Sequence, residues 1–181
     1  MLRNIVLIGS MGCGKSHIGR KLANRLRWQF VDTDRRIEKI TGCSIAAYYE
    51  EYGEDEFRRK EHEIMRQISY YHEAVLSIGG NFVPDRRTLS MLKRYSYIIG
   101  LQAEPKAIVH RVKRRMGKRP TMDYDNLESF VQNMVHSWGH VYKQCNLVID
   151  TTSEGPDCIA AAILRHIEKE QLTFAKRKWM P

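Results

Sequence analysis

Short apolar runs alternate along the chain with longer stretches in which apolar residues follow a helical spacing. Uninterrupted apolar runs occur at 4–8, 74–78, 97–101 and 147–149, and a shorter segment at 28–31 has a similar character. Continuous rather than alternating apolar runs are typical of strands buried on both faces of a parallel sheet. The pattern therefore predicts five strands, of which those at 4–8 and 74–78 are expected to be buried in the sheet.

The stretches between these runs predict helices. From Lys15 to Arg27 the apolar positions Ile18, Leu22, Ala23 and Leu26 recur at helical spacing. Further helices are expected at 35–41, 44–52, 54–71, 84–93, 104–115, 126–142 and 156–170. Strands separated by helices, with no hairpin dipeptides between them, imply right-handed crossovers and a doubly wound α/β fold with a parallel sheet.

Length and composition restrict the class of protein. The chain of 181 residues suits one domain, and 43% hydrophobic with 28% charged residues is ordinary globular usage. No apolar run approaches the length needed to span a bilayer, which argues against a membrane protein. The four cysteines include no Cys-x-x-Cys pair. We expect a cytoplasmic protein with reduced thiols.

The net charge of +9 is concentrated in two segments. Residues 105–119 contain seven Lys and Arg and no acid, and 171–181 contain three more and no acid, so that the other 20 cations nearly balance the 21 acids. A compact cationic segment can bind a nucleoside triphosphate as well as a nucleic-acid backbone, or it can be a solvated helix face. Residues 115–125 combine turn residues with charge, and we expect a mobile loop there.

The sequence Gly9–Ser16 matches G-x-x-x-x-G-K-[ST] and lies between a predicted strand and a predicted helix. Glycines let successive backbone amides turn toward one phosphate, and the helix N-terminus adds partial positive charge. Lys15 is then expected to reach the β- and γ-phosphates of ATP and Ser16 to hold Mg²⁺. The alternative is a flexible glycine turn. The guanine-reading Asn-Lys-x-Asp is absent, and a motor would be larger, so small-molecule kinases remain as the main class.

Two carboxylates, Asp32 and Asp34, end the second predicted strand, and ligands bind at the carboxyl ends of parallel strands. One is expected to act near the metal and the other to orient an acceptor hydroxyl toward the γ-phosphate. The alternative is that Asp34 only caps a helix beginning at Arg35.

Taken in order, several motifs resemble those of the shikimate kinase family over roughly residues 3–170. They are Gly9–Ser16, Asp32-x-Asp34, the run from Gly53 to Glu61, Gly79-Gly80 and Arg119-Pro120. The resemblance implies a three-layer P-loop kinase fold with a central five-stranded parallel sheet, a helical substrate-binding region at about 33–62 and a lid at about 113–126. It implies a monomer that transfers the γ-phosphate of ATP, with Mg²⁺, to the 3-hydroxyl of shikimate, with no nucleic-acid or membrane partner. Residues 1–170 would form one domain, followed by a basic tail.

The resemblance also implies roles for individual residues. The nucleotide would contact Gly12, Cys13, Gly14, Lys15, Ser16 and His17, with Arg115 packed on adenine and Arg119 brought to the phosphates by the lid. Asp34 would polarise the substrate hydroxyl, and Asp32 would lie near the metal. Arg58 would pair with the substrate carboxylate and Gly79-Gly80 would approach the ring hydroxyls.

Each of the less specific roles has an alternative. Arg58 could form ion pairs with Glu54 or Glu61 on its own helix. Arg119 could be a solvated loop charge, and Gly79-Gly80 a plain turn that ends a strand.

Two positions depart from the family pattern. Asn81 replaces a third glycine, and Trp138 stands where the family has a second arginine for the substrate carboxylate. Loss of a charge-assisted hydrogen bond costs roughly 1.5–3 kcal/mol. The departures leave open a related kinase for another polyol or cyclic hydroxy acid, and a non-catalytic metabolite-binding module is a third hypothesis. Trp138 alone could equally be a core residue, and His136 and His140 are expected on the surface.

Overall fold

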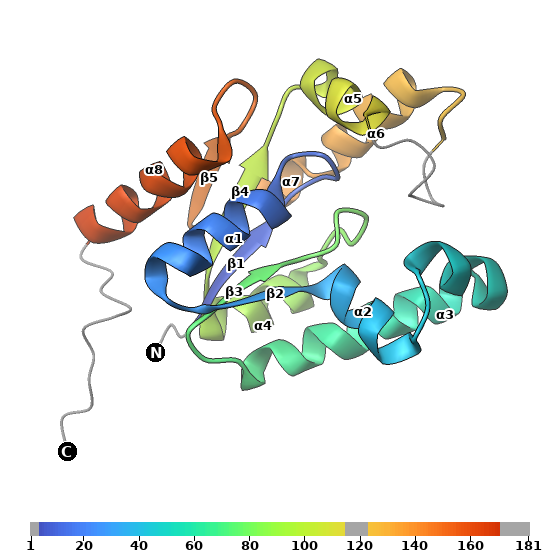
Figure 1. Ribbon diagram of the computed structural model, residues 1–181, viewed down its shortest axis with the longest axis horizontal. Coiled ribbons are helices and arrows are strands. Elements are labelled where there is room, and N and C mark those ends of the chain that lie inside the picture. The colour runs from blue at the N-terminus through green and yellow to red at the C-terminus, as the bar shows by residue number, and fades with distance from the viewer. Residues whose placement is uncertain (1–3, 115–122, 171–181) are drawn as a thin grey trace.

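The computed structural model describes residues 4–114 and 123–170, and a parallel sheet lies at its centre between layers of helices (Figure 1). The strands are β1 (Asn4–Ile8), β2 (Gln29–Asp32), β3 (Ala74–Ser77), β4 (Ser96–Gln102) and β5 (Leu147–Asp150). Their order across the sheet is β2-β3-β1-β4-β5, and every paired neighbour is parallel. The predicted α/β class with a five-stranded parallel sheet is confirmed.

Each predicted helix is present in the structure, but two predicted regions are divided differently. The helices are α1 (Lys15–Leu26), α2 (Thr33–Thr41), α3 (Ile45–Gln67), the 3₁₀ helix η1 (Ile68–Tyr70), α4 (Arg86–Tyr95), α5 (Pro105–Lys113), α6 (Leu127–Ser137), α7 (Gly139–Tyr142) and α8 (Pro156–Lys169). The helices predicted at 44–52 and 54–71 meet in α3, where Gly53 at φ 77° marks the break between them. The helix predicted at 126–142 divides at Trp138, whose amide bonds the carbonyl of Val135 three residues back.

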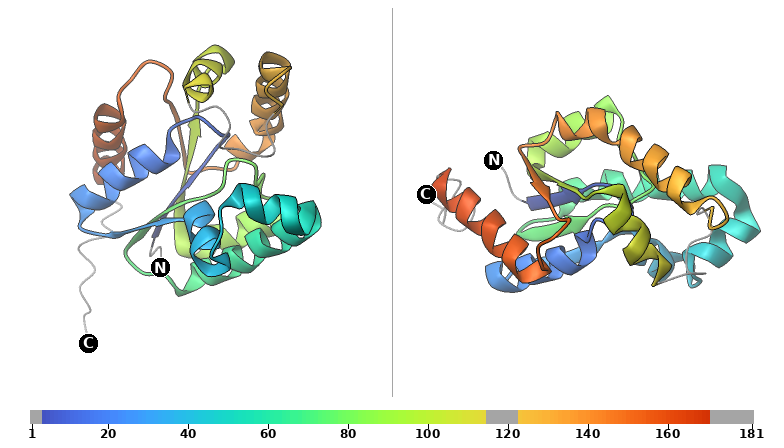
Figure 2. Two further views of the ribbon diagram at one scale, coloured as in Figure 1. Left: turned by 45° about the vertical axis from the view of Figure 1, so that its right-hand side comes forward. Right: turned by 90° about the horizontal axis from the view of Figure 1, so that it is seen from above.

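Side-chain alternation in the strands divides the core into two layers. In β1, Ile5 and Leu7 pack with residues of α1 and α8, whereas Val6 and Ile8 pack with residues of η1, α4 and α7. Seen from above, α1 and α8 lie together on one side of the sheet, with α4 and α6 on the other (Figure 2). Because both faces are covered, the continuous apolar runs of the central strands are fully buried.

Two smaller apolar clusters extend beyond the sheet. One joins α2 to α3 through Ile37, Tyr48, Phe57 and Ile64. The other joins α5 to α6 and includes Met11 of the glycine-rich turn. Most of the predicted lid, with Arg115 and Arg119, lies outside the described residues. Among the helices that are described, none has the length and apolar character required to cross a bilayer.

Candidate active site

The glycine-rich turn between β1 and α1 has a backbone that side chains would disturb. Gly9, Gly12 and Gly14 have φ of 143°, 81° and 97°. A Cβ atom on Gly9 would lie 2.1 Å from the carbonyl oxygen of Leu101. The N-cap of α1 is Gly14, which makes no side-chain capping hydrogen bond, so no capping side chain of this residue blocks an anion from the N-terminus of the helix.

Lys15, the first residue of α1, is almost fully buried and points back over the turn. Its Nζ donates to the carbonyl oxygens of Gly9 at 2.7 Å and Ser10 at 2.9 Å. These carbonyls hold the ammonium beside the backbone amides of the same turn. The turn therefore presents one full positive charge together with the partial charges of a helix N-terminus.

Ser16 and Asp32 meet across the end of the sheet. The Ser16 hydroxyl donates to Asp32 Oδ2 at 2.6 Å, and Asp32 Oδ1 accepts from the Arg35 amide at 3.5 Å. Asp32 is thus the N-cap of α2. The alternative in which Asp34 caps a helix beginning at Arg35 is wrong, because the chain becomes helical at Thr33.

Asp34, in the first turn of α2, lies against the loop that follows β3. A Cβ atom on Gly79 would be 2.5 Å from Asp34 Oδ1, and the Gly79 amide donates to the Thr33 hydroxyl at 2.9 Å. A Cβ atom on Gly80 would be 2.6 Å from the Met11 amide nitrogen. The two glycines therefore let this loop touch both α2 and the glycine-rich turn.

Arg58 is held by three partners. Its guanidinium donates to Glu61 Oε2 at 2.6 Å, to Glu54 Oε1 at 3.2 Å and to the carbonyl of Asn81 at 3.2 Å. Burial acts to lower the pKa of Arg58, but the hydrogen bonds and charges of Glu61 and Glu54 raise it above its ordinary value. Both ion pairs named as the alternative role of Arg58 are formed, and its pairing with a substrate carboxylate stays a prediction.

Glu61 is buried, although sequence reasoning considered it only as a partner of Arg58. Burial raises its pKa to about 7, the Arg58 guanidinium opposes this shift, and the charge of Asp34 adds to it. A buried carboxyl with a shifted pKa beside Asp34 makes Glu61 a candidate functional group. A glutamate three residues after an arginine on a charged helix carried no signal of burial in the sequence.

A cleft of about 580 Å³ at the carboxyl ends of the strands brings most predicted residues together. Its lining includes Gly12, Cys13, Gly14, Lys15, Ser16, His17, Asp32, Asp34 and Gly80. Arg58 and Gly79 are not among its lining residues. Gly79 nevertheless packs against Asp34, and Arg58 bonds Glu61, whose carboxyl also lies near Gly79. The cleft is large enough for a nucleotide phosphate chain beside a small acceptor.

Arg111 of α5 also lines the cleft, and sequence reasoning gave it no individual role. Its guanidinium donates to the carbonyls of Gly12 at 3.2 Å and Thr152 at 3.1 Å, and also to that of Thr151. The Thr151 hydroxyl in turn donates to the Cys13 carbonyl at 2.8 Å. Arg111 therefore joins α5, the glycine-rich turn and the loop after β5, and the concentration of cations at 105–119 was the one signal for it.

Trp138 is a core residue. It is fully buried among the apolar side chains between the sheet and α4, and its ring stacks on Tyr142 with centroids 6.1 Å apart. It does not line the cleft. His136 and His140 are exposed, as predicted, and over 4–114 and 123–170 no three His, Cys, Asp or Glu side chains form a metal-binding group.

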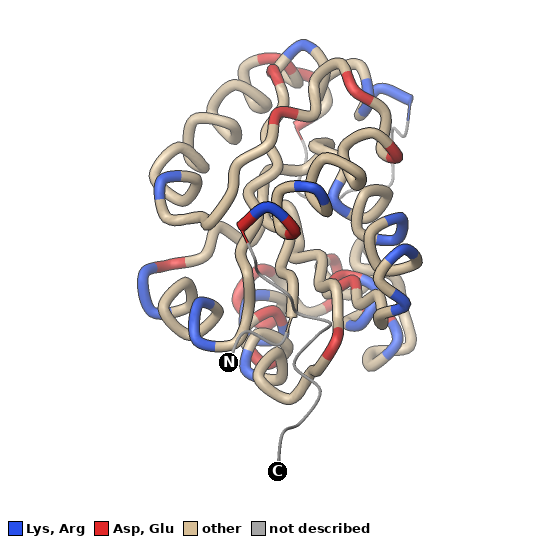
Figure 3. The backbone as a smooth tube through the Cα atoms, turned by 90° about the vertical axis from the view of Figure 1, so that its left-hand side faces the viewer, with Lys and Arg blue, Asp and Glu red and all other residues tan. Residues whose placement is uncertain are grey.

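Lys and Arg are mixed with acidic residues along the described backbone that faces the viewer in Figure 3. Ion pairs such as Lys21 with Asp157 at 3.1 Å and Arg59 with Glu56 at 2.6 Å neutralise part of the positive charge.

Comparison with known families agrees with this geometry. The family model described as shikimate kinase matches residues 11–168. A curated shikimate kinase of Pelotomaculum thermopropionicum is 35% identical over 169 residues, which is 93% of this chain and 97% of the relative. A shikimate kinase of Thermus thermophilus is 33% identical over 168 residues, 91% of each chain.

Solved structures with the same arrangement include shikimate kinases. A structure of shikimate kinase from Acinetobacter baumannii in complex with shikimate superposes with a TM-score of 0.88 at 28% identity, covering 95% of this chain and 96% of that one. The enzyme from Aquifex aeolicus gives a TM-score of 0.79 at 26% identity, covering 93% and 98%.

Proposed function

The chain belongs to the shikimate kinase family, and on this premise we propose that it transfers the γ-phosphate of ATP to the 3-hydroxyl of shikimate. The observation that carries the proposal is that the phosphate-binding turn and Asp34 line the same cleft. A phosphate donor and an alcohol bound there would lie next to each other. Phosphoryl transfer needs such positioning more than it needs a strong base.

At the nucleotide end, the amides of the glycine-rich turn and Lys15 would bind the phosphates. Ser16 and Asp32 fit a site for Mg²⁺, because two oxygen side chains 2.6 Å apart face the cleft beside that turn. When bound, Mg²⁺ would neutralise negative charge on the β- and γ-phosphates. Arg111 would hold the glycine-rich turn and the loop after β5 at a fixed distance from each other, because it donates to carbonyls of both. The two sides of the nucleotide site would therefore keep their separation.

At the acceptor end, Asp34 would accept a hydrogen bond from the reacting hydroxyl and aim its oxygen at the γ-phosphate. Arg58 would bind the substrate carboxylate after exchange with Glu54, whose side chain is 59% exposed. Glu61 would keep the guanidinium in place through its short hydrogen bond. The close packing of Gly79 on Asp34 would hold that carboxylate in position.

A second candidate function follows from Trp138. Because this side chain is buried in the core, it adds neither charge nor hydrogen bond to the acceptor end of the cleft. A kinase of this family that acts on another cyclic hydroxy acid or polyol would retain the whole phosphate-binding turn. The protein in either case is proposed to be a monomeric cytoplasmic enzyme.

The test is a comparison of acceptors. ADP release from ATP and Mg²⁺ is measured with shikimate, quinate, gluconate and nucleoside monophosphates, and the phosphorylated product is identified by mass spectrometry. We expect turnover with shikimate that Lys15→Ala removes. ADP release with quinate or gluconate but not with shikimate would support the second candidate, and no release with any acceptor would contradict both.

A further inference from the structure

A second hollow, of about 570 Å³, lies between α4 and η1. Its polar lining consists of Arg86, Arg87, Arg94, Ser69, Ser90 and Tyr95. We propose that this hollow binds a small phosphorylated ligand at a site separate from the cleft of the glycine-rich turn.

The hollow gathers three guanidinium groups, of which Arg87 has an acidic neighbour in Asp85. None of its lining residues is acidic. Arg86 and Arg94 form no ion pair or side-chain hydrogen bond within the described part of the chain, whereas the similarly exposed Arg59 is paired with Glu56 at 2.6 Å. The nearest acid in sequence, Asp85, uses its carboxylate to cap α4 by accepting from the Thr88 amide at 2.7 Å. An anion would supply a counter-charge to Arg86 and Arg94.

The spacing of these residues suits one compact ligand. Arg86, Ser90 and Arg94 follow each other at intervals of four residues, so they lie along one face of α4. Guanidinium forks match the paired oxygens of a phosphate, and the hydroxyls of Ser90 and Tyr95 add neutral donors. A helix of ten residues is about 15 Å long, which fits a small molecule better than an extended polymer.

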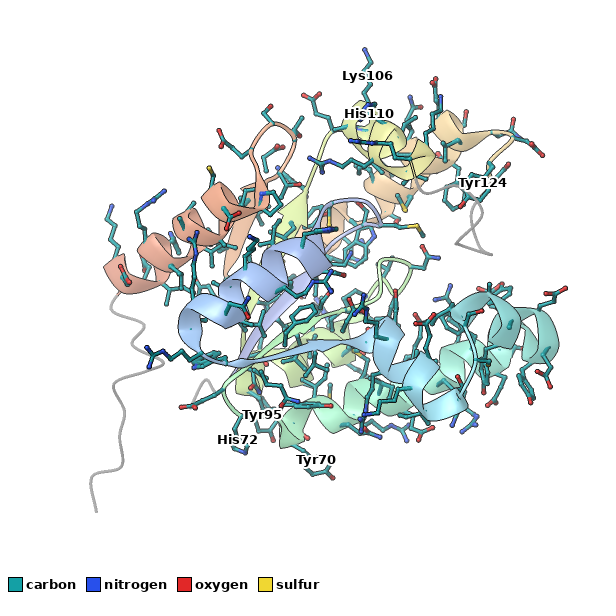
Figure 4. The ribbon with its side chains drawn as sticks, in the orientation of Figure 1. Tyr70, His72, Tyr95, Lys106, His110 and Tyr124 are labelled. Carbon is teal, nitrogen blue, oxygen red and sulfur yellow. The ribbon has the colours of Figure 1, made fainter. Side chains whose placement is uncertain are left out.

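The hollow and the cleft open at different ends of the molecule. Tyr95 immediately precedes β4, and it lies with Tyr70 and His72 at the end of the molecule away from Lys106 and Tyr124 (Figure 4). The glycine-rich turn follows the carboxyl end of β1, and the carboxyl ends of all the parallel strands lie at the opposite end of the sheet from the start of β4. A ligand in the hollow would therefore not compete directly with a nucleotide in the cleft.

The hollow has a volume suited to a bound metabolite. Ligand sites commonly measure about 300–1,000 Å³, and the volume of the hollow falls in this range. Arginine side chains on an open surface bind most strongly to multiply charged anions, because the interaction of exposed charges is weakened by salt. Pyrophosphate, with two linked phosphates, is the suitable probe.

The experiment is a calorimetric titration of the full chain with pyrophosphate at low ionic strength. We expect two sites in the unaltered protein. Arg86→Gln with Arg94→Gln should weaken one of them at least tenfold, and Lys15→Ala should weaken only the other. Lys93→Gln, which removes an exposed charge of α4 outside the hollow, should change neither. Circular dichroism melting of each variant checks that it is folded.

Three results of the pyrophosphate titration would overturn the proposal. They are unchanged pyrophosphate binding in the folded Arg86→Gln, Arg94→Gln variant, loss of all binding in Lys15→Ala, and equal weakening by Lys93→Gln. An RNA oligonucleotide that bound through Arg86 and Arg94 while pyrophosphate did not would also overturn it and identify the surface as a polymer site. Because the readout is binding of pyrophosphate, the result is independent of which acceptor the enzyme phosphorylates.

Discussion

The Arg58 guanidinium donates a 2.6 Å hydrogen bond to Glu61, and this glutamate is buried beside Asp34. The pair joins the middle of α3 to the side of the cleft that Asp34 lines. Because Arg58 also donates to the Asn81 carbonyl, the same guanidinium supports the loop that carries Gly79 and Gly80. One ion pair thus connects the helical region to the loop against which Asp34 packs.

The stability of the protein should depend on the protonation of Glu61. Its pKa is raised by burial from 4.5 to about 7, so the folded state retains a proton that the unfolded state loses between these values. This contribution is fully present below pH 4.5 and is lost as the pH rises through 7. We therefore expect the free energy of unfolding of the unaltered protein to decrease between about pH 4.5 and 8. Measured relative to Glu61→Gln, which cannot titrate at this position, the decrease should be at most about 3 kcal/mol.

Urea unfolding of both proteins at several pH values measures this difference. Glu54→Gln, which removes the exposed partner of the same guanidinium, should retain the pH dependence. A difference between Glu61→Gln and the unaltered protein that stays constant with pH would show that Glu61 is ionised throughout.

Loss of the Lys15 ammonium should lower turnover strongly without unfolding the chain. Lys15→Ala removes the ammonium that lies over the glycine-rich turn, and removing a group that stabilises charge in a transition state typically lowers kcat by about 10²–10³. Lys21→Ala, in an exposed ion pair of the same helix, should change turnover by less than about twofold. Steady-state ADP release distinguishes the two variants, and comparable losses in both would contradict a specific role for Lys15.

Contact between the loop after β3 and the glycine-rich turn requires Gly80. In Gly80→Ala the new Cβ would lie 2.6 Å from the Met11 amide nitrogen, so backbone must shift. We expect a loss of about 1–3 kcal/mol in stability together with a clear loss of turnover. Gly139→Ala meets no atom within 4 Å and lies in a helix, so it should be neutral or slightly stabilising. Thermal melting and ADP release test both, and a normal Gly80→Ala enzyme would refute the close approach.

Trp138 should be needed for stability, and an arginine there should not restore a substrate contact. Trp138→Ala leaves a cavity in the core and should cost about 3–5 kcal/mol. Trp138→Arg should destabilise the protein at least as much, because it buries a charge that has no partner. Trp138→Phe is the matched control with a smaller loss. Urea unfolding measures all three, and a stable Trp138→Arg protein with improved affinity for the acceptor would contradict the core role.

Arg111 should affect nucleotide affinity indirectly, by fixing the backbone on two sides of the cleft. Arg111→Ala removes hydrogen bonds to three backbone carbonyls, and we expect KM for ATP to rise by about tenfold while KM for the acceptor changes little. Arg111→Lys should recover part of the loss. Lys106→Ala, an exposed change in the same helix (Figure 4), serves as the control. An equal rise in both KM values would indicate a general structural defect instead.

Much of the candidate site could be read from the sequence because its signals are local. The phosphate-binding motif combines glycines with a strand before it and a helix after it, and all lie within about twenty consecutive residues. The pair Asp32 and Asp34 follows a strand directly. The end of α6 at Trp138 and the capping of α2 by Asp32 were missed or misassigned, since helix boundaries depend on individual hydrogen bonds that periodicity does not report.

By itself, the sequence determined the strands and helices, the parallel α/β class and the position of the phosphate-binding turn, because periodicity and backbone freedom act between near neighbours. Only the tertiary structure decided the order of the strands, the burial of Glu61 and Trp138, and the contacts of Arg111 with the turn 99 residues earlier in the chain. These depend on packing between segments far apart in sequence, and the same residue types are equally compatible with an exposed helix face until the segments meet.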